Sequence, residues 1–264
     1  MIPKTIHYCW FGRNPKPKLA EKCIKSWKNY CKGYKIIEWN EDNFDVFACP
    51  LYVRQAYESK QWAFVTDYVR LKVVYDNGGI YLDTDVQVIK PLDGFLKYKS
   101  FFGFEEKEYV ATGLGFGAEK NSKIIKEVMK QYEDVPFIKA DGSFECLPCP
   151  QRNTEVFKSY GLVQNGETQY LSDGVVVFAS EYFCPISYET LKKRITKKTY
   201  TIHWFSASWH DKETKEKERI RRKKNNRKYK KEKRRAVFFY LPKIFIKRIL
   251  GEKKYEIIKS KIKK

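Results

Sequence analysis

The chain has 264 residues, enough for one sizeable domain with a buried core and an appendage. Its 42% hydrophobic and 16% aromatic content excludes a disordered chain. The net charge of +21 is concentrated at the end, because residues 211–264 hold 24 Lys and Arg against 7 Asp and Glu. This change of composition predicts a globular domain over residues 1–210 and a basic tail over residues 211–264.

Cysteine usage and hydropathy indicate the compartment. Seven cysteines, an odd number, are typical of a reducing environment, and the single CxxC pair, Cys146 and Cys149, favours a structural role over metal or redox chemistry. No window reaches the roughly 18 consecutive apolar residues that a spanning helix needs. The opening stretch "MIPKTIHYCWFG" also lacks the apolar region of a signal peptide. The sequence therefore predicts a cytoplasmic protein that does not cross a membrane.

The first predicted elements form a βαβ unit. Residues 5–12 read as a strand that ends at Gly12, residues 19–30 as a helix and residues 34–40 as a second strand. Such a unit predicts an α/β protein with a partly parallel sheet.

A mostly apolar helix pattern then begins near Trp62 and ends at the sequence Asn77-Gly78-Gly79. Residues 80–89 read as one strand that follows it. The remaining predictions are strands over 101–106, 114–119 and 174–180, and a helix over 123–132.

Two carboxylates, Asp83 and Asp85, lie one residue apart within the strand pattern of residues 80–89. In an extended chain they would point to one side and repel each other unless a cation lay between them. Oxygen ligands suit Mg²⁺ or Mn²⁺, and the carboxyl edge of an α/β sheet suits a nucleotide diphosphate. The alternative is a pair of solvated turn residues.

Three further charged or titratable residues are candidates. Asp67 and Arg70 share one face of an apolar helix, where they form either a structural ion pair or part of a site. His203, one of three histidines, either completes an oxygen-rich metal or phosphate site or is a satisfied residue at a strand end.

Three blocks, "IPKTIHYCWFG", "FVTDYVRLKVVYDNGGIYLDTD" and "YTIHWFSASW", resemble glycosyltransferase family 32. This family of DXD-containing sugar transferases includes bacterial capsular polysaccharide enzymes and yeast mannosyltransferases, and it is related to the catalytic domains of the large clostridial toxins. The resemblance covers residues 1–210 in outline and is specific in the three blocks. It implies a GT-A type α/β fold in which a divalent metal bridges the donor diphosphate.

The resemblance also implies roles for the candidates. Asp83 and Asp85 would be the Mn²⁺ or Mg²⁺ motif, with Asp85 the direct ligand and His203 the third member. Asp67 and Arg70 would contact hydroxyls of the donor sugar and, with Asp85, form the catalytic set.

Nucleotide contacts are carried over in the same way. Trp10 would stack on the nucleobase, whereas without the resemblance a core aromatic is favoured. Either Ser206 or Ser208, together with Trp209, would close over the diphosphate. The segment "CLPCPQRNTEVF" is a candidate lining of the acceptor cleft.

The predicted function is therefore retaining hexosyl transfer from a nucleotide sugar, with a UDP-hexose ahead of GDP-mannose. The acceptor would be a saccharide, free or lipid-linked, in capsular or surface polysaccharide synthesis. A metal-dependent nucleotide-sugar hydrolase would need a further base, which the sequence near the DXD motif does not supply. A nucleic-acid-binding protein that uses the basic tail is the other alternative.

The tail has two parts. Residues 212–235 are nearly all polar, so they predict a solvated helix or a disordered arm, and residues 236–250 are apolar with basic residues set among them. This combination favours binding in the interface of an anionic bilayer, at the inner face of the cell membrane. The alternative is a helix docked on the core, preceded by a basic arm.

Overall fold

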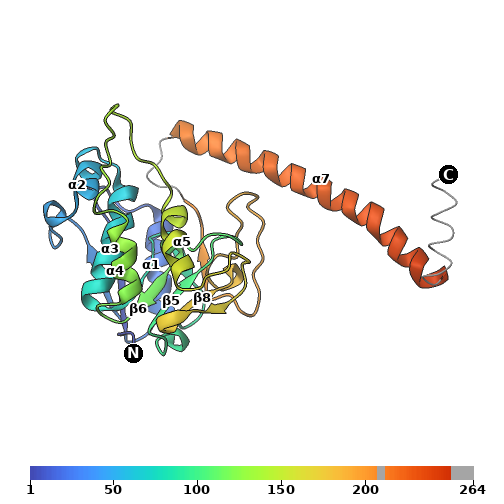
Figure 1. The fold of residues 1–264 in the computed structure, drawn as a ribbon, viewed down its shortest axis with the longest axis horizontal. Coiled ribbons are helices and arrows are strands. Elements are labelled where there is room, and N and C mark those ends of the chain that lie inside the picture. Colours follow the sequence, from blue (N-terminus) through green and yellow to red (C-terminus); the bar gives the residue numbers. More distant parts are fainter. Residues whose placement is uncertain (207–211, 251–264) are drawn as a thin grey trace. The chain divides into compact units, whose positions relative to one another are not determined.

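In a computed structural model of the chain, residues 1–206 and 212–250 are described (Figure 1). The chain divides into two compact units. The first comprises Met1–Tyr188 and Lys193–Asp211, and the second comprises Glu189–Lys192 and Lys212–Lys264.

The first unit contains a seven-stranded mixed sheet. Strand β1 pairs in parallel with β2 and β3, and β5 pairs in parallel with β8, while β6 and β7 run antiparallel to their neighbours. This sheet confirms the predicted α/β fold with a partly parallel sheet. The strand order is β2 (Lys35–Trp39), β1 (Thr5–Cys9), β3 (Gly79–Tyr81), β6 (Phe116–Ala118), β5 (Ser100–Gly103), β8 (Val175–Phe178) and β7 (Gln169–Tyr170).

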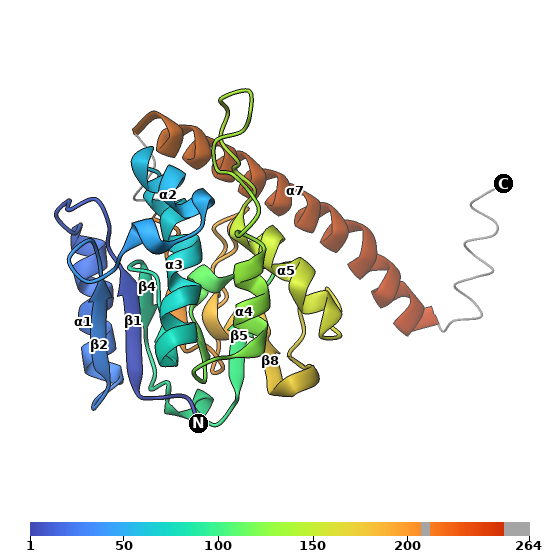
Figure 2. The ribbon, with the colours of Figure 1, turned by 60° about the vertical axis from the view of Figure 1, so that its left-hand side comes forward.

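Helices cover both faces of this sheet (Figure 2). Alternation along the strands divides the core, since Tyr81 packs with α2–α5 while Ile80 and Leu82 pack with α1 and α6 on the opposite face. The α-helices are α1 (Lys18–Tyr30), α2 (Leu51–Glu58), α3 (Trp62–Asn77), α4 (Lys123–Lys130), α5 (Cys149–Ser159) and α6 (Ser180–Phe183). Short 3₁₀ turns are η1 (Val46–Ala48), η2 (Asp93–Phe95), η3 (Thr112–Leu114) and η4 (Ser172–Gly174).

The single strand predicted over residues 80–89 is wrong, because the chain turns there. After β3, the Val86 amide donates to the Asp83 carbonyl at 2.9 Å, and the chain enters β4 (Val86–Val88). Strand β4 leaves the large sheet and pairs antiparallel with β9 (Thr201–His203) in a two-stranded sheet. The two aspartates therefore occupy a turn between sheets, and strand alternation does not place them on one side.

Two glycines after α3 allow β1 to approach closely. Trp39 Nε1 donates to His7 Nδ1 at 3.0 Å, so His7 Nε2 carries the proton and donates to the Gly78 carbonyl at 2.8 Å. A Cβ on Gly79 would lie 2.8 Å from His7 Nε2, and both glycines have positive φ. His7, from the first of the three sequence blocks, thus packs against Gly78 and Gly79, from the second.

The second unit consists of the long helix α7 (Lys212–Leu250) and the short segment Glu189–Lys192. Lys192 Nζ donates to the Tyr229 hydroxyl at 3.0 Å, and Asn225 Nδ2 donates to Glu189 Oε2 at 2.8 Å. The basic part of the tail is therefore helical. Within the part of the chain that the structure describes, no helix has the length and apolar character to cross a membrane.

Candidate active site

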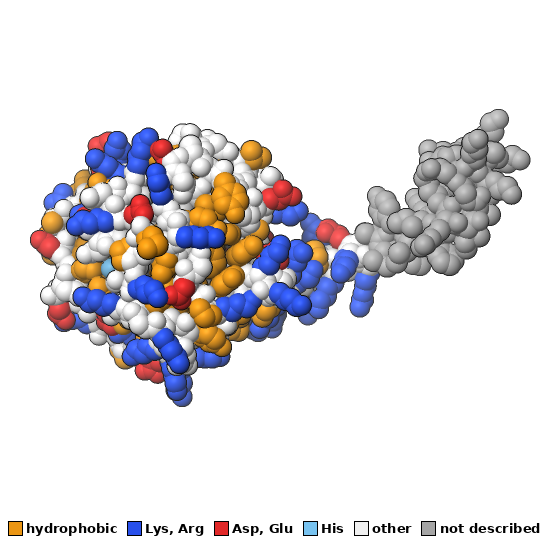
Figure 3. Space-filling view, turned by 90° about the horizontal axis from the view of Figure 1, so that it is seen from below, with side chains coloured by type: hydrophobic (Ala, Val, Ile, Leu, Met, Phe, Trp, Pro, Cys, Tyr) orange, Lys and Arg blue, Asp and Glu red, His pale blue; other side chains and the backbone are white. Residues whose placement is uncertain are grey.

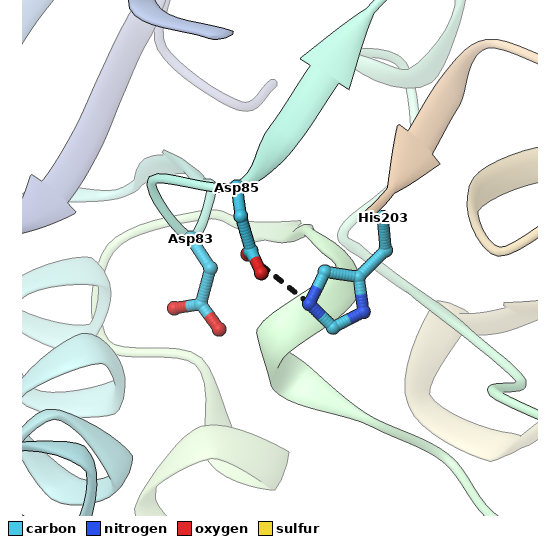
Figure 4. A group of neighbouring side chains, drawn as sticks. All are labelled: Asp83, Asp85 and His203. Atoms are coloured by element: carbon cyan, nitrogen blue, oxygen red, sulfur yellow. Dashed lines mark ion pairs between the residues drawn. The ribbon is translucent and has the colours of Figure 1, made fainter. Parts of the chain in front are cut away.

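The DXD turn and the end of β9 meet at one point. In the β4–β9 ladder Val86 pairs with His203, so Asp85 lies beside the imidazole. Ligand atoms of Asp83, Asp85 and His203 all lie within 4.8 Å of one another (Figure 4). The structure thus brings together the three residues predicted as the metal site, from segments far apart in the sequence.

Asp85 is held on both carboxylate oxygens. His203 Nε2 is 3.2 Å from Asp85 Oδ1, and the Ser206 amide donates to Asp85 Oδ2 at 2.8 Å. Burial alone would raise the pKa of Asp85, but His203 and Ser206 together hold it well below its ordinary value. Asp85 is therefore an anion ready to accept a cation.

The pKa of the His203 imidazole depends on its burial and on nearby carboxylates. Burial lowers the pKa of its imidazole, but the adjacent Asp85 more than reverses this and raises it. Its second ring nitrogen, Nδ1, has no hydrogen-bond partner in the described part of the chain. Glu105, in the loop after β5, is close enough to add to the rise, and the sequence had not indicated this carboxylate.

Arg70 is the central cation of the site. Its side chain, 5% exposed, lies 3.2 Å from Asp67 Oδ1 through Nη1 and 3.2 Å from Asp83 Oδ1 through Nη2. The Tyr81 hydroxyl also donates to Asp83 Oδ1, at 3.0 Å. Of the two predicted sugar-contacting residues, Arg70 therefore binds the first aspartate of the DXD motif directly, and Asp67 is linked to it through Arg70.

Asp67 has the least exposed side chain of the three carboxylates, 11% against 24% for Asp83 and 13% for Asp85. Burial raises its pKa to about 6, against the opposing effect of Arg70. One guanidinium is shared between Asp67 and Asp83, so neither carboxylate is fully neutralised by a cation of its own. A site with this excess of negative charge favours a bound cation.

Backbone and sulfur complete the surroundings of Arg70. A Cβ on Gly113, in η3, would lie 2.6 Å from Asp83 Oδ2 and 3.3 Å from Arg70 Nη1. Arg70 Nη1 donates to Cys149 Sγ at 3.7 Å. Sequence reasoning missed Cys149, and its only signal was the CxxC spacing.

The predicted nucleotide contacts are only partly described. Trp10 directly follows β1 and donates through Nε1 to the Asn14 carbonyl at 2.6 Å, with Lys16 Nζ 5.7 Å from the ring centroid. Of the two serines weighed for the diphosphate, Ser206 binds Asp85 through its amide. Ser208 and Trp209 lie outside the described residues.

Two residues of the segment "CLPCPQRNTEVF", which was considered as a lining of the acceptor cleft, make contacts within the fold. The Thr154 hydroxyl is buried, donates to the Pro150 carbonyl at 2.6 Å and accepts from the Val110 amide at 2.9 Å. Glu155 is exposed and pairs with Lys158 at 2.7 Å.

The donor set fits a divalent cation. Two carboxylates and one imidazole, with ligand atoms within 4.8 Å of one another, are suited to Mn²⁺, and the carboxylates also to Mg²⁺. The pKa of Asp85, held low, keeps one ligand ionised without competition from protons near neutral pH. The site is thus chemically able to bind the metal that the DXD motif predicts.

Comparison with known proteins gives a match in the part of the chain that holds the DXD motif. Residues 17–102 match the family described as "Glycosyltransferase sugar-binding region containing DXD motif". Mouse (Mus musculus) lactosylceramide 4-alpha-galactosyltransferase is 26% identical over 161 residues, which cover 57% of this chain and 43% of the relative. An uncharacterised glycosyltransferase of Acanthamoeba polyphaga mimivirus is 34% identical over 142 residues, 49% of this chain and 55% of the relative.

Among solved structures, the PaToxG glycosyltransferase aligns with a TM-score of 0.45 at 18% identity, over 60% of this chain and 68% of that one. The chain spans about half the length of the mouse and mimivirus relatives, 43% and 55%. The family match covers both DXD aspartates and the Asp67–Arg70 pair. The predicted resemblance to the family 32-type glycosyltransferases is thus confirmed, since residues 17–102 match the DXD sugar-binding region and both curated relatives are named glycosyltransferases.

Proposed function

We propose that the chain is a metal-dependent, retaining glycosyltransferase that moves a hexose from a nucleotide diphosphate sugar to a saccharide acceptor. The observation that carries the proposal is the convergence of Asp83, Asp85 and His203 next to the buried Asp67–Arg70 pair. Both aspartates and the ion pair lie within the residues that match the DXD sugar-binding region. Mn²⁺ or Mg²⁺ bound by the three ligands would offset the negative charge of the donor diphosphate.

The chain's own residues would orient the donor. Asp67 and Arg70 offer an acceptor and a donor of hydrogen bonds to sugar hydroxyls, and their mutual ion pair at 3.2 Å fixes both. Trp10 would stack on the base. A UDP-hexose is the first candidate donor and GDP-mannose the second.

Retention is what the resemblance implies, and the contacts of the carboxylates bear on how it would occur. Asp67 is engaged by Arg70, Asp83 by Arg70 and Tyr81, and Asp85 by His203 and Ser206. None of the three is disposed to attack the anomeric carbon as a nucleophile. The acceptor hydroxyl would then attack on the face that the diphosphate leaves.

The acceptor would be a saccharide, lipid-linked in the preferred case, in capsular or surface polysaccharide synthesis. The name of the mouse relative, a lactosylceramide galactosyltransferase, supports transfer of a hexose to a lipid-linked saccharide. Residues 211–264 would form a separate tail that holds the enzyme at the inner face of the membrane, through 24 Lys and Arg against 7 Asp and Glu.

The basic tail also suits nucleic acid, but one face of the first unit shows no surface that would extend that function (Figure 3). Figure 3 shows Lys and Arg side chains scattered over one face of this unit among hydrophobic, acidic and other polar groups. Among the described residues of that face they form no continuous basic stripe of the kind that follows a phosphate backbone.

The test is a panel of UDP- and GDP-sugars, each incubated with the full-length protein with and without Mn²⁺. Unfolding temperature and donor hydrolysis are measured together, with EDTA-treated protein as the control. We expect one donor to stabilise the protein and to be hydrolysed slowly only when metal is present. Absence of any response to all donors would refute the proposal.

A further inference from the structure

Cys149 is the first residue of α5 and lies against the ion pair on α3. Arg70 Nη1 donates to Cys149 Sγ at 3.7 Å and lies 3.2 Å from Asp67 Oδ1. The thiol also acts as a donor toward the Asp67 carboxylate and lowers the pKa of that group. Guanidinium, thiol and carboxylate are thus grouped as a ring of three side chains from two helices.

The thiol is in its protonated, donating form. Burial raises the pKa of Cys149 well above that of an ordinary thiol, and the charge of Asp67 adds to the rise. A neutral thiol is a weak donor, but a donor to a buried carboxylate replaces a lost contact with water. Asp67 is 8% exposed, and Arg70, its ion-pair partner among the described residues, is shared with Asp83, so a second donor matters to it.

Helix α5 is anchored in the core, and this fixes the position of Cys149 relative to α3. The side chains of Val156 and Phe157 are buried in the core shared by α2, α3 and α4. Arg152 is also buried and donates to the Gln131 carbonyl at 2.8 Å. Because α5 is packed along its length, its first residue, Cys149, is held close to Asp67.

We propose that Cys149 is a positioning residue of the donor-sugar site, whose thiol holds Asp67 and Arg70 in the geometry that the sugar hydroxyls require. This inference rests on the proposed function. It assigns the second cysteine of the CxxC pair a role that needs no metal and no disulfide. Cys146, three residues earlier, is exposed and serves as the matched control.

The experiment separates hydrogen bonding from packing with opposite substitutions. Cys149→Ser keeps a donor and loses apolar packing, whereas Cys149→Val keeps apolar packing and loses the donor, and Cys149→Ala does so without added bulk. We expect kcat/KM for the donor to fall about tenfold in the Val and Ala variants, since a hydrogen bond to a charged group is lost. The Ser variant should retain most of the wild-type value, and Cys146→Val all of it.

A purely structural cysteine would give the reverse order, with Cys149→Ser the damaging change and Cys149→Ala or Cys149→Val tolerated. That result would overturn the proposal, and so would equal kcat/KM in all three variants. In either case, sugar transfer by the wild-type protein would leave the proposed function unaffected.

The ring can also be tested without activity. A double-mutant cycle of Asp67→Asn and Cys149→Val, followed by chemical unfolding, should give midpoint shifts that are not additive, because the two side chains touch. Additive shifts would mean that no such contact exists, whatever reaction the protein catalyses. Absence of transfer in the wild-type protein, by contrast, would count against the proposed function alone.

Discussion

Asp85 links the DXD turn to the segment at the end of β9, since His203 and Ser206 both contact its carboxylate and the Trp204 amide donates to its carbonyl at 3.1 Å. Asp85→Asn keeps the shape of the side chain and removes its charge. We expect donor turnover to fall by at least about a hundredfold, because a metal ligand worth several kcal/mol is lost. The unfolding midpoint should stay near that of the wild type.

The matched control is Asp93→Asn, since Asp93 is a half-exposed carboxylate paired with Lys4 at 2.7 Å. Its turnover should be unchanged. Wild-type turnover in Asp85→Asn, measured at saturating donor and Mn²⁺, would show that Asp85 does not bind the metal.

His7 makes a different kind of contribution, to stability. Burial lowers the pKa of its imidazole, with a smaller opposite effect from the Gly78 carbonyl. Because the pKa in the folded state lies below the ordinary value of 6.5, the unfolded state takes up the proton first as pH falls. The contribution of His7 is complete above about pH 6.5 and is lost as pH falls through the lowered pKa.

The variant His7→Gln can still donate to Gly78 and accept from Trp39 but does not titrate. We expect its free energy of unfolding to fall less than that of the wild type between neutral and mildly acid pH. The measurement is a series of urea titrations across that range. Parallel pH profiles would show that His7 is not the titrating group.

At the scale of elements, the backbone of the η3 turn lies directly against Asp83. A Cβ on Gly113 would meet Asp83 Oδ2 at 2.6 Å, while one on Gly94, in the η2 turn, would meet nothing within 4 Å. Gly113→Ala should therefore displace Asp83 and lower donor turnover, by on the order of a hundredfold for a shift of about 1 Å. Gly94→Ala should leave it unchanged. Equal turnover in both variants would mean that the position of Asp83 is not critical.

Elements with strong periodicity could be predicted from the sequence. Helices α1 and α3 and strands β1, β2 and β8 follow apolar patterns that local reasoning can read. Helix α5 was not predicted, because its buried face includes Arg152, Asn153 and Thr154, whose polarity masks the helical period. The contact of Cys149 with Arg70 was missed for the same reason.

The site was predicted in composition and not in geometry. Asp83, Asp85 and His203 were named from motif and resemblance, but the turn between β3 and β4 interrupts a run whose alternation reads as one strand. Only the pairing of β4 with β9, a tertiary contact, brings His203 to Asp85. Local patterns carry no information on such a change from one sheet to another.

At the scale of the whole molecule, the charge of residues 211–264 predicts a function separate from catalysis. Apart from the buried Arg222, the basic side chains of helix α7 whose burial is described are exposed. Each Lys or Arg close to an anionic membrane contributes roughly 1 kcal/mol to binding. A variant with four changes to Gln should therefore bind anionic vesicles far more weakly, with donor hydrolysis unchanged; the changed residues are Arg227, Lys228, Lys230 and Lys231.

Binding is measured by co-sedimentation with phosphatidylglycerol vesicles at low and moderate salt, with phosphatidylcholine vesicles as the neutral comparison. The control carries the same loss of charge on α1 and α4 of the first unit, at the exposed residues Lys25, Lys28, Lys126 and Lys130. We expect this control to bind like the wild type, because its charges lie outside the tail. Equal loss of binding in both variants would mean that net charge, and not the tail, attracts the membrane. Preference of the wild type for duplex DNA over the anionic vesicles would assign the tail to nucleic acid instead.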